Sequence, residues 1–146
     1  MNKKLQFRLI AFDSEAYVNT LKLRHEILRA PLGLKFSEED LKKEFADFHL
    51  AGFYGSRLAA CMVLSPYNES TIKMRQVAVE ATLQGNGVGK QLVLEAEKIC
   101  TGKRFQRIVL NARDAVVPFY EKLGYKSISD VFMEVGIPHV TMEKNL

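Results

Sequence analysis

Three glycines stand at every second position, Gly85, Gly87 and Gly89, between a predicted strand and a predicted helix. Glycine lets backbone N–H groups face a ligand with no Cβ in the way. The first turn of a helix adds unpaired N–H groups and a partial positive charge. Such a stretch is typical of a site for phosphate or pyrophosphate. A plain turn before a surface helix is the alternative interpretation.

The spacing around these glycines excludes the two common phosphate loops. The nucleotide P-loop needs a glycine where Gln84 stands and a hydroxyl residue where Gln91 stands. The dinucleotide-binding pattern needs a glycine at the position of Lys90. The order Gln84-x-x-Gly87-x-Gly89 resembles instead the pyrophosphate-binding motif of the GNAT-type N-acetyltransferase superfamily, which holds acetyl-coenzyme A (acetyl-CoA).

Two patterns in the C-terminal half are similar to the same superfamily. Residues 119–125 resemble its Tyr-x-x-x-Gly-Phe/Tyr signature, and residues 132–142 resemble the Glu-x-Gly-Ile-Pro-His-x-x-Met ending of its ElaA-like branch. The resemblance covers residues 70–146 by motif and the N-terminal half by the order of its elements. The chain is therefore identified as a member of the GNAT superfamily with an ElaA-like C-terminal signature.

The resemblance implies one acetyltransferase domain over residues 1–146. It would transfer the acetyl group of acetyl-CoA to a primary amine, on a small molecule or a peptide, by direct attack in a ternary complex. Acetyl-CoA would be a co-substrate, no metal is expected, and a homodimer is possible. The residues expected at the cofactor are Val77, Ala78, Val79, Gln84, Gly85, Asn86, Gly87, Val88, Gly89, Lys90, Arg113 and Phe119.

The same resemblance implies roles in the chemistry. A backbone N–H within residues 77–79 would polarise the thioester carbonyl. Tyr120 would protonate the leaving thiolate, although its place in an apolar helical stripe also suits a core residue. Arg113 stands where the superfamily often has asparagine. Its guanidinium could still donate hydrogen bonds to the cofactor arm or pair with a phosphate.

The general base is less clear from the sequence. The strand before the loop offers Lys73, Arg75 and Gln76, none of them a natural base. His139 and Glu134, both in the Glu-x-Gly-Ile-Pro-His stretch, are the remaining candidates. A histidine pKa of about 6.5 suits base catalysis at neutral pH. His139 could instead only bond the backbone of its Gly-Ile-Pro turn.

Composition excludes other classes of protein. The 146 residues are 47% apolar and 26% charged, with no apolar run long enough for a membrane span. The net charge of +4 suits an anionic cofactor and is too small for a nucleic-acid surface. Cys61 and Cys100 lie in apolar patterns without metal spacing. They are expected to be buried free thiols, which favours the cytoplasm.

Hydrophobic periodicity predicts an α/β fold with a mixed sheet of about seven strands and about four helices. A strand–helix–strand crossover at residues 70–111 predicts a parallel pair. Helix breaks are expected at Pro31 and Gly33. The strands are predicted at 5–12, 48–55, 58–65, 70–81, 106–111, 125–133 and 138–145, and the helices start near residues 14, 37, 87 and 114.

Two other functions stay open at this stage. The missing base on the strand before the loop would fit a non-catalytic CoA-binding regulatory module. A nucleotide-binding domain unrelated to CoA is opposed by the failed P-loop and dinucleotide spacings. No motif in the sequence specifies the acceptor amine.

Overall fold

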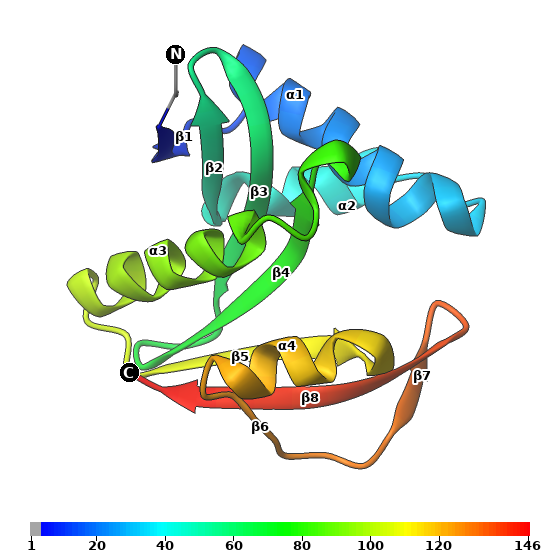
Figure 1. Cartoon of the computed structure of the whole chain (residues 1–146), viewed down its shortest axis with the longest axis vertical. Coiled ribbons are helices and arrows are strands. Elements are labelled where there is room, and N and C mark those ends of the chain that lie inside the picture. The colour runs from blue at the N-terminus through cyan, green and yellow to red at the C-terminus, as the bar shows by residue number, and fades with distance from the viewer. Residues whose placement is uncertain (1–3) are drawn as a thin grey trace.

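An eight-stranded mixed sheet organises the structure, a computed structural model that describes residues 4–146 (Figure 1). The strands are β1 (Leu5–Ile10), β2 (Phe48–Tyr54), β3 (Arg57–Pro66), β4 (Thr71–Val79), β5 (Arg107–Arg113), β6 (Lys126–Ser127), β7 (Phe132–Glu134) and β8 (Ile137–Asn145). Their order is β1-β2-β3-β4-β5-β8-β6, with β7 also paired to β8. Among these described strands, only β4 and β5 pair in parallel, as predicted.

The predicted strand over residues 125–133 is in fact two short strands, which raises the count from about seven to eight. β6 and β7 each pair with β8. Between them the chain leaves the sheet, and the Thr141 amide donates to Ser129 Oγ at 2.9 Å. The Ser129 side chain thus accepts a bond that a backbone carbonyl would accept in a continuous strand. Hydrophobic alternation in the sequence cannot predict such a break.

Four α-helices cover the two faces of the sheet (Figure 1). α1 (Glu15–Arg24) and α2 (Glu38–Lys42) lie on one face, and α3 (Val88–Gly102) and α4 (Val117–Lys122) lie on the other. Ser14 Oγ accepts the Tyr17 amide, and Ser37 Oγ accepts the Asp40 amide, both at 3.1 Å. These bonds cap α1 and α2 at the predicted starts.

The helical path after α1 runs past Pro31 instead of breaking there. A π-helical turn, η1 (His25–Arg29), is followed by a 3-10 turn, η2 (Ala30–Leu32). Pro31 sits at the start of η2, where its missing N–H has no partner to lose. Gly33, with φ of +69°, then ends the path as expected.

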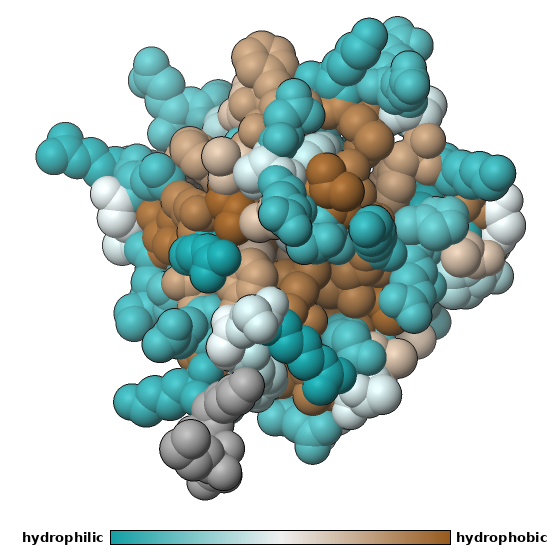
Figure 2. All heavy atoms as spheres, turned by 90° about the horizontal axis from the view of Figure 1, so that it is seen from above, coloured by the Kyte–Doolittle hydropathy of each residue, from teal (hydrophilic) through white to brown (hydrophobic). Residues whose placement is uncertain are grey.

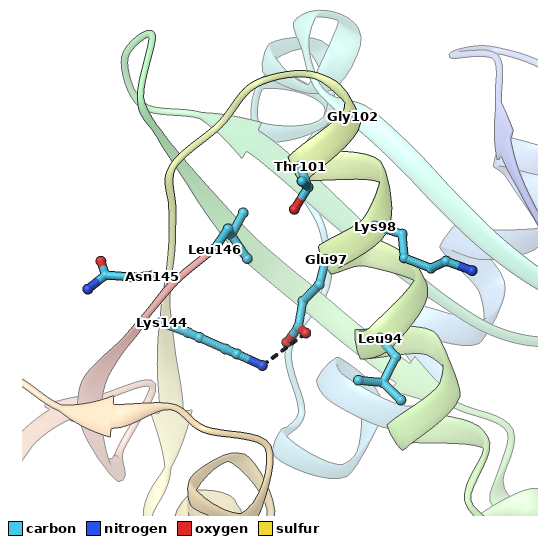
Figure 3. Close-up of a pocket in the computed structure, with 8 residues that line it drawn as sticks. All are labelled: Leu94, Glu97, Lys98, Thr101, Gly102, Lys144, Asn145 and Leu146. Carbon is cyan, nitrogen blue, oxygen red and sulfur yellow. Dashed lines mark hydrogen bonds and ion pairs between the residues drawn. The ribbon is translucent and has the colours of Figure 1, made fainter.

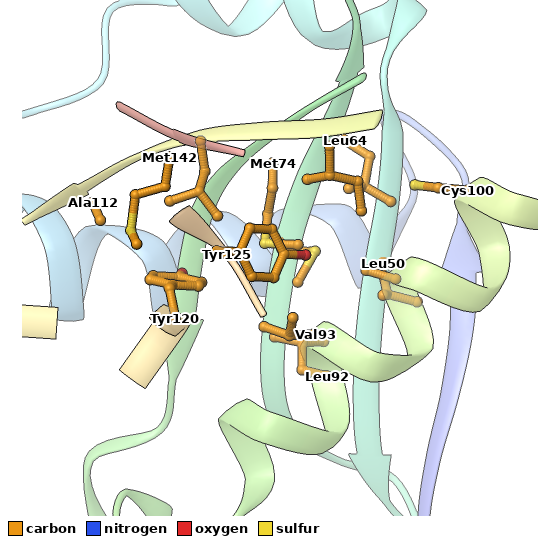
Figure 4. Close-up of a cluster of buried hydrophobic side chains, with 14 of the residues drawn as sticks. Leu50, Leu64, Met74, Leu92, Val93, Cys100, Ala112, Tyr120, Tyr125 and Met142 are labelled. Carbon is orange, nitrogen blue, oxygen red and sulfur yellow. The ribbon is translucent and has the colours of Figure 1, made fainter. Parts of the chain in front are cut away.

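The main hydrophobic core lies between the sheet and the pair α3 and α4 (Figure 4). A smaller cluster on the other face joins Leu23 of α1 to Cys61 of β3 and Ala78 of β4. Cys61 and Cys100 are both free and buried, as predicted. Burial raises the pKa of the Cys61 thiol to about 12 and that of Cys100 to about 11.

β4 and β5 separate after a short paired region. They pair only from Thr71 to Lys73 of β4, although β4 continues to Val79. The register between β3 and β4 shifts next to Gln76, which has a left-handed φ of +54°. Such a bulge bends its strand. The sheet therefore opens beside the C-terminal half of β4 (Figure 1).

The molecular surface mixes apolar and polar side chains. On the face seen in Figure 2, hydrophobic side chains gather across the middle and hydrophilic ones surround them. None of the helices within residues 4–146 combines the length and the apolar character that a membrane span requires.

Candidate functional site

The glycine loop, residues 84–90, connects a 3-10 turn, η4 (Ala81–Leu83), to the start of α3. Gly85 and Gly87 adopt φ values of +82° and +80°, a region that other residues enter only with strain. An ideal Cβ added at either glycine would meet no atom within 4 Å. The loop therefore needs glycine for its conformation, and open space lies beside it.

The backbone amides of residues 85–90 are free of backbone partners within the described chain. The last bond before them runs from the Gln84 amide to Ala81 O, and the next from the Gln91 amide to Gly87 O. Gly87 caps α3 without a side-chain bond. Consecutive free N–H groups at the positive end of a 15-residue helix suit an anion with several oxygens. A pyrophosphate fits this donor set.

Side chains of the loop fix its shape instead of pointing at a ligand. Gln84 Nε2 donates to Val79 O at 3.0 Å, which ties the loop to the end of β4. Asn86 Nδ2 lies 3.4 Å from the carbonyls of Leu83 and Gln84. Val88 is buried in the core. Asn86 and Val88 can offer a ligand their backbone N–H groups, whereas the Gln84 amide is already bonded to Ala81 O.

α4 borders the same loop through Phe119. A Cβ at Gly89 would lie 3.6 Å from Phe119 Cζ and 3.7 Å from Val79 Cγ2. Phe119 is 36% exposed. The structure thus brings Val79, the glycine loop and Phe119 together at the open end of the sheet, three segments that were predicted separately.

Tyr120 lies behind Phe119 in the core. It is buried and packs edge-on against Phe119 and Tyr125, with ring centroids 5.0 and 5.6 Å away. Burial raises its pKa to about 12. Its hydroxyl has no hydrogen-bond partner within residues 4–146, whereas the Tyr125 hydroxyl donates to Glu97 at 2.9 Å. Tyr120 is thus a core residue with a free, protonated hydroxyl.

His139 and Glu134 lie together on the opposite face of the sheet. His139 of β8 is opposite Arg113, and the neighbouring pair, Ala112 and Val140, belongs to the core on the α4 side. Side chains alternate between faces along a strand, so His139 faces the α1 side. His139 Nε2 is 3.4 Å from Glu134 Oε2.

The hydrogen bonds of His139 define which nitrogen can accept a proton. Nδ1 lies 2.8 Å from Ile137 O, and a carbonyl can only accept, so Nδ1 carries hydrogen. Nε2 is then the basic nitrogen, and it faces the Glu134 carboxyl group. His139 is buried, whereas the Glu134 side chain is 46% exposed. His139 can therefore bond the backbone of its turn through Nδ1 and still accept a proton at Nε2.

Asn111 holds the other oxygen of Glu134. Asn111 Nδ2 donates to Glu134 Oε1 at 3.3 Å, and Asn111 Oδ1 accepts from Thr141 Oγ1 at 2.9 Å. No sequence motif assigns a role to Asn111 or Thr141. Alternation on β5 could have found Asn111, because it shares a face with Arg113 two residues later.

Arg113 reaches a different partner from the one expected. Its Nη2 donates to Leu28 O of η1 at 3.5 Å. This contact directs the guanidinium toward the α1 side and ties β5 to η1. Its observed hydrogen bond therefore does not support the expected cofactor role.

Gln76, which the sequence showed only as a residue unsuited to be the base, has an unusual environment in the structure. Its Oε1 is buried and has no hydrogen-bond partner among the described residues. The sequence does carry a signal for the bulge, because the alternation of Ile72 and Met74 slips by one residue to Val77 and Val79.

A separate groove lies at the far end of α3 (Figure 3). Its lining includes Leu94, Thr101 and the ion pair between Glu97 Oε1 and Lys144 Nζ at 3.0 Å. The glycine loop begins the same helix, so this groove is distinct from the site described above.

A family model described as an acetyltransferase (GNAT) domain matches residues 32–146. A UPF0039 protein of Schizosaccharomyces pombe is 33% identical over 95 residues, 62% of this chain and 61% of that protein. The uncharacterized N-acetyltransferase YitI of Bacillus subtilis is 29% identical over 138 residues, 88% and 91% of the two chains. Protein ElaA of Escherichia coli is 27% identical over 67% of this chain and 66% of its own length. The matches to several further relatives span only about half of their length.

Solved structures share the fold. A putative N-acetyltransferase from Lactobacillus plantarum superposes with a TM-score of 0.88 at 21% identity, over 97% of this chain and 98% of that one. A Bacillus subtilis acetyltransferase in complex with CoA gives a TM-score of 0.74 at 21% identity, over 98% and 99% of the chains. At this identity the likeness establishes the architecture alone.

Proposed function

The chain belongs to the GNAT acetyltransferase family, and we propose that it transfers the acetyl group of acetyl-CoA to a primary amine. The acceptor is a small molecule or a peptide, and attack is direct, within a ternary complex. The observation that carries the proposal is the run of free backbone amides at residues 85–90, beside the opening between β4 and β5. The free, buried cysteines favour a cytoplasmic location.

Backbone groups do most of the cofactor binding. The amides of residues 85–90 donate to the pyrophosphate, and Phe119 packs against the bound molecule next to Gly89. A backbone N–H in residues 77–79 polarises the thioester carbonyl, beyond the point where β4 has lost its partner β5. CoA bound to a Bacillus subtilis acetyltransferase of the same fold supports this choice of ligand.

The two candidate proton-transfer groups, Tyr120 and His139, lie on opposite faces of the sheet. The amine nitrogen forms a bond to the acetyl carbon, the carbon–sulfur bond breaks, and the amine loses one proton. Nε2 of His139, oriented by Ile137 O and Glu134, accepts that proton. Tyr120 donates its hydroxyl proton to the leaving sulfur and recovers one through solvent. A raised pKa keeps Tyr120 protonated until then.

Release of free thiol from acetyl-CoA tests the proposal directly. The wild type is assayed with spermidine, tyramine, glucosamine, kanamycin and a peptide with a free N-terminal alanine. Kanamycin is included because an aminoglycoside 6'-N-acetyltransferase shares the fold. We expect amine-dependent thiol release with at least one acceptor. Tight binding of acetyl-CoA without release for any amine would instead favour a non-catalytic CoA-binding module.

A further inference from the structure

The buried oxygen of Gln76 lacks the partner that such atoms normally have. Oε1 has no hydrogen-bond partner among residues 4–146. In folded proteins the large majority of buried polar side-chain atoms are bonded, so each exception needs a physical explanation. A ligand that arrives with an N–H donor provides one.

The backbone at Gln76 is unusual in a second, independent way. Its φ is +54°, a left-handed value that costs energy in a residue with a Cβ. The β3–β4 register shifts between Cys61 and Val63, opposite this position. Bulges of this kind re-aim a side chain, and they are frequent beside active sites. The strained backbone therefore orients the Gln76 side chain differently from a side chain in a regularly paired strand.

The position of Gln76 relates it to the proposed acetyl site. β4 and β5 are last paired at Lys73 and Val109, so Gln76 lies three residues into the unpaired part of β4. It directly precedes Val77, the first residue of the stretch proposed to polarise the thioester. The oxygen without a partner therefore belongs to the segment where the attacking nitrogen must arrive.

We propose that Gln76 Oε1 binds the acceptor amine by accepting one of its N–H groups, an inference that rests on the function proposed above. An amide oxygen accepts hydrogen bonds and carries no charge. It can hold a neutral amine. A carboxylate, by contrast, would favour the charged ammonium form. Since only the neutral amine has a lone pair, the side chain orients a nucleophile that is ready to attack. Gln76 is an acceptor-binding residue, and the proton still goes to His139.

Gln76→Met is the first test, because it keeps the length of the side chain and removes its acceptor. Steady-state kinetics are measured with the amine acceptors named above, beside Gln6→Met, which changes an exposed strand glutamine. We expect KM for the amine to rise between about 5-fold and 100-fold, the range for one lost hydrogen bond in a buried site. KM for acetyl-CoA should stay at the wild-type value.

Thermal unfolding of the free protein gives a readout that does not depend on turnover. Gln76→Met removes a buried polar atom that has no partner, so its Tm should equal or exceed that of the wild type. Gln76→Glu keeps an acceptor oxygen, and its amine KM should stay closer to the wild-type value than that of Gln76→Met.

Three results would overturn the assignment. A lower Tm for Gln76→Met would mark a structural residue, and a higher KM for acetyl-CoA would mark a cofactor contact. An unchanged amine KM, with the wild type active, would refute the amine role alone. If the wild type acetylates none of the amines, the proposed function fails and this inference fails with it.

Discussion

Tyr120 and Tyr125 are neighbouring tyrosines in one core, and their hydroxyls differ in hydrogen bonding. Both are buried, but the Tyr125 hydroxyl is committed to Glu97 at 2.9 Å, whereas the Tyr120 hydroxyl has no partner within the described chain. The Tyr120 hydroxyl is thus available for the proton-donor role proposed above, whereas the Tyr125 hydroxyl is not.

Removing the two hydroxyls should therefore affect different properties, the turnover number for Tyr120 and the stability for Tyr125. Tyr120→Phe should lower kcat by about 100-fold or more, within the range for general acid catalysis, and leave the affinity for acetyl-CoA unchanged. Tyr125→Phe should leave kcat unchanged and cost about 1–3 kcal/mol of unfolding free energy, because Glu97 Oε2 loses its hydrogen bond while Oε1 keeps its ion pair with Lys144. Kinetics and urea unfolding of both variants check this, and full activity of Tyr120→Phe would contradict it.

His139 and Glu134 should behave as one unit in mutant kinetics. Nε2 of His139 has the carboxyl group of Glu134 as its polar neighbour at 3.4 Å. His139→Gln and Glu134→Gln should each lower kcat, and the double variant should be little slower than His139→Gln alone. Asn19→Ala, an exposed change on α1, serves as a control. Independent, multiplicative losses would show that Glu134 does not act through His139.

At the residue scale, the sequence predicted the groups that belong to motifs and missed those defined by contacts. Gly85 and Gly87 could be predicted because their conformation restricts the residue type. Gln76 could not, because the burial of its oxygen without a hydrogen-bond partner can be seen only in the folded structure. The partner of Arg113 depends on where η1 lies, which no local pattern specifies.

A buried ion pair joins α1 to the 3-10 turn η3 (Lys43–Ala46) at the element scale. Arg24 donates to both oxygens of Glu44 at 2.8 and 2.6 Å, and Tyr17 Oη donates to Oε1 at 2.8 Å. Arg24 and Glu44 are 1% and 4% exposed. This contact fixes α1 and the turn after α2 relative to each other, and η1, which bonds Arg113, continues from α1.

Glu44→Gln should cost about 3 kcal/mol or more, because it leaves the Arg24 charge buried without its counterion. Burial alone would raise the pKa of Glu44, but the hydrogen bonds and charge of Arg24 outweigh it and lower the pKa below 4.5. The folded protein therefore gains stability from this carboxylate above pH 4.5 and loses it as the pH falls through the lowered pKa.

Acid unfolding checks that sign. Unfolding free energies from urea titrations between neutral and acidic pH should fall more steeply for the wild type than for Glu44→Gln. Glu38→Gln, an exposed change on α2, should follow the wild-type slope. Parallel slopes for wild type and Glu44→Gln would mean that Glu44 has the same pKa in the folded and unfolded chains.

Elements with strong periodicity could be predicted from the sequence, and those defined by distant partners could not. α3 matches its prediction because five buried residues recur at helical spacing. The π turn of η1 and the division between β6 and β7 have no local signal. Their observed partners, β5 for η1 and β8 for β6 and β7, lie far away in the chain.

At the scale of the whole molecule, the proposed cofactor site exists only when separate segments meet. The loop follows β4, Phe119 comes from α4, and the opening needs β5 to diverge from β4. An unfolded chain has none of this geometry. A ligand of the site should therefore bind the folded state alone, and its binding should raise the stability of the entire structure.

Gly87→Glu should abolish that stabilisation. Glutamate puts a side chain and a negative charge into the open space beside the free amides. Gly33→Glu is the matched control, because Gly33 has a similar φ of +69° and equally open surroundings away from the loop. Both variants carry the same kind of backbone strain, so their Tm values without ligand should fall together.

Thermal unfolding with acetyl-CoA, CoA, ATP and NAD separates the ligand classes. At about 100 times its Kd, a ligand adds roughly 2.7 kcal/mol to the stability of the folded state. We expect acetyl-CoA and CoA to raise the Tm of the wild type and of Gly33→Glu, but not that of Gly87→Glu. Stabilisation by ATP or NAD in preference to CoA would contradict the choice of pyrophosphate ligand. An equal CoA shift in Gly87→Glu would place the cofactor somewhere other than the glycine loop.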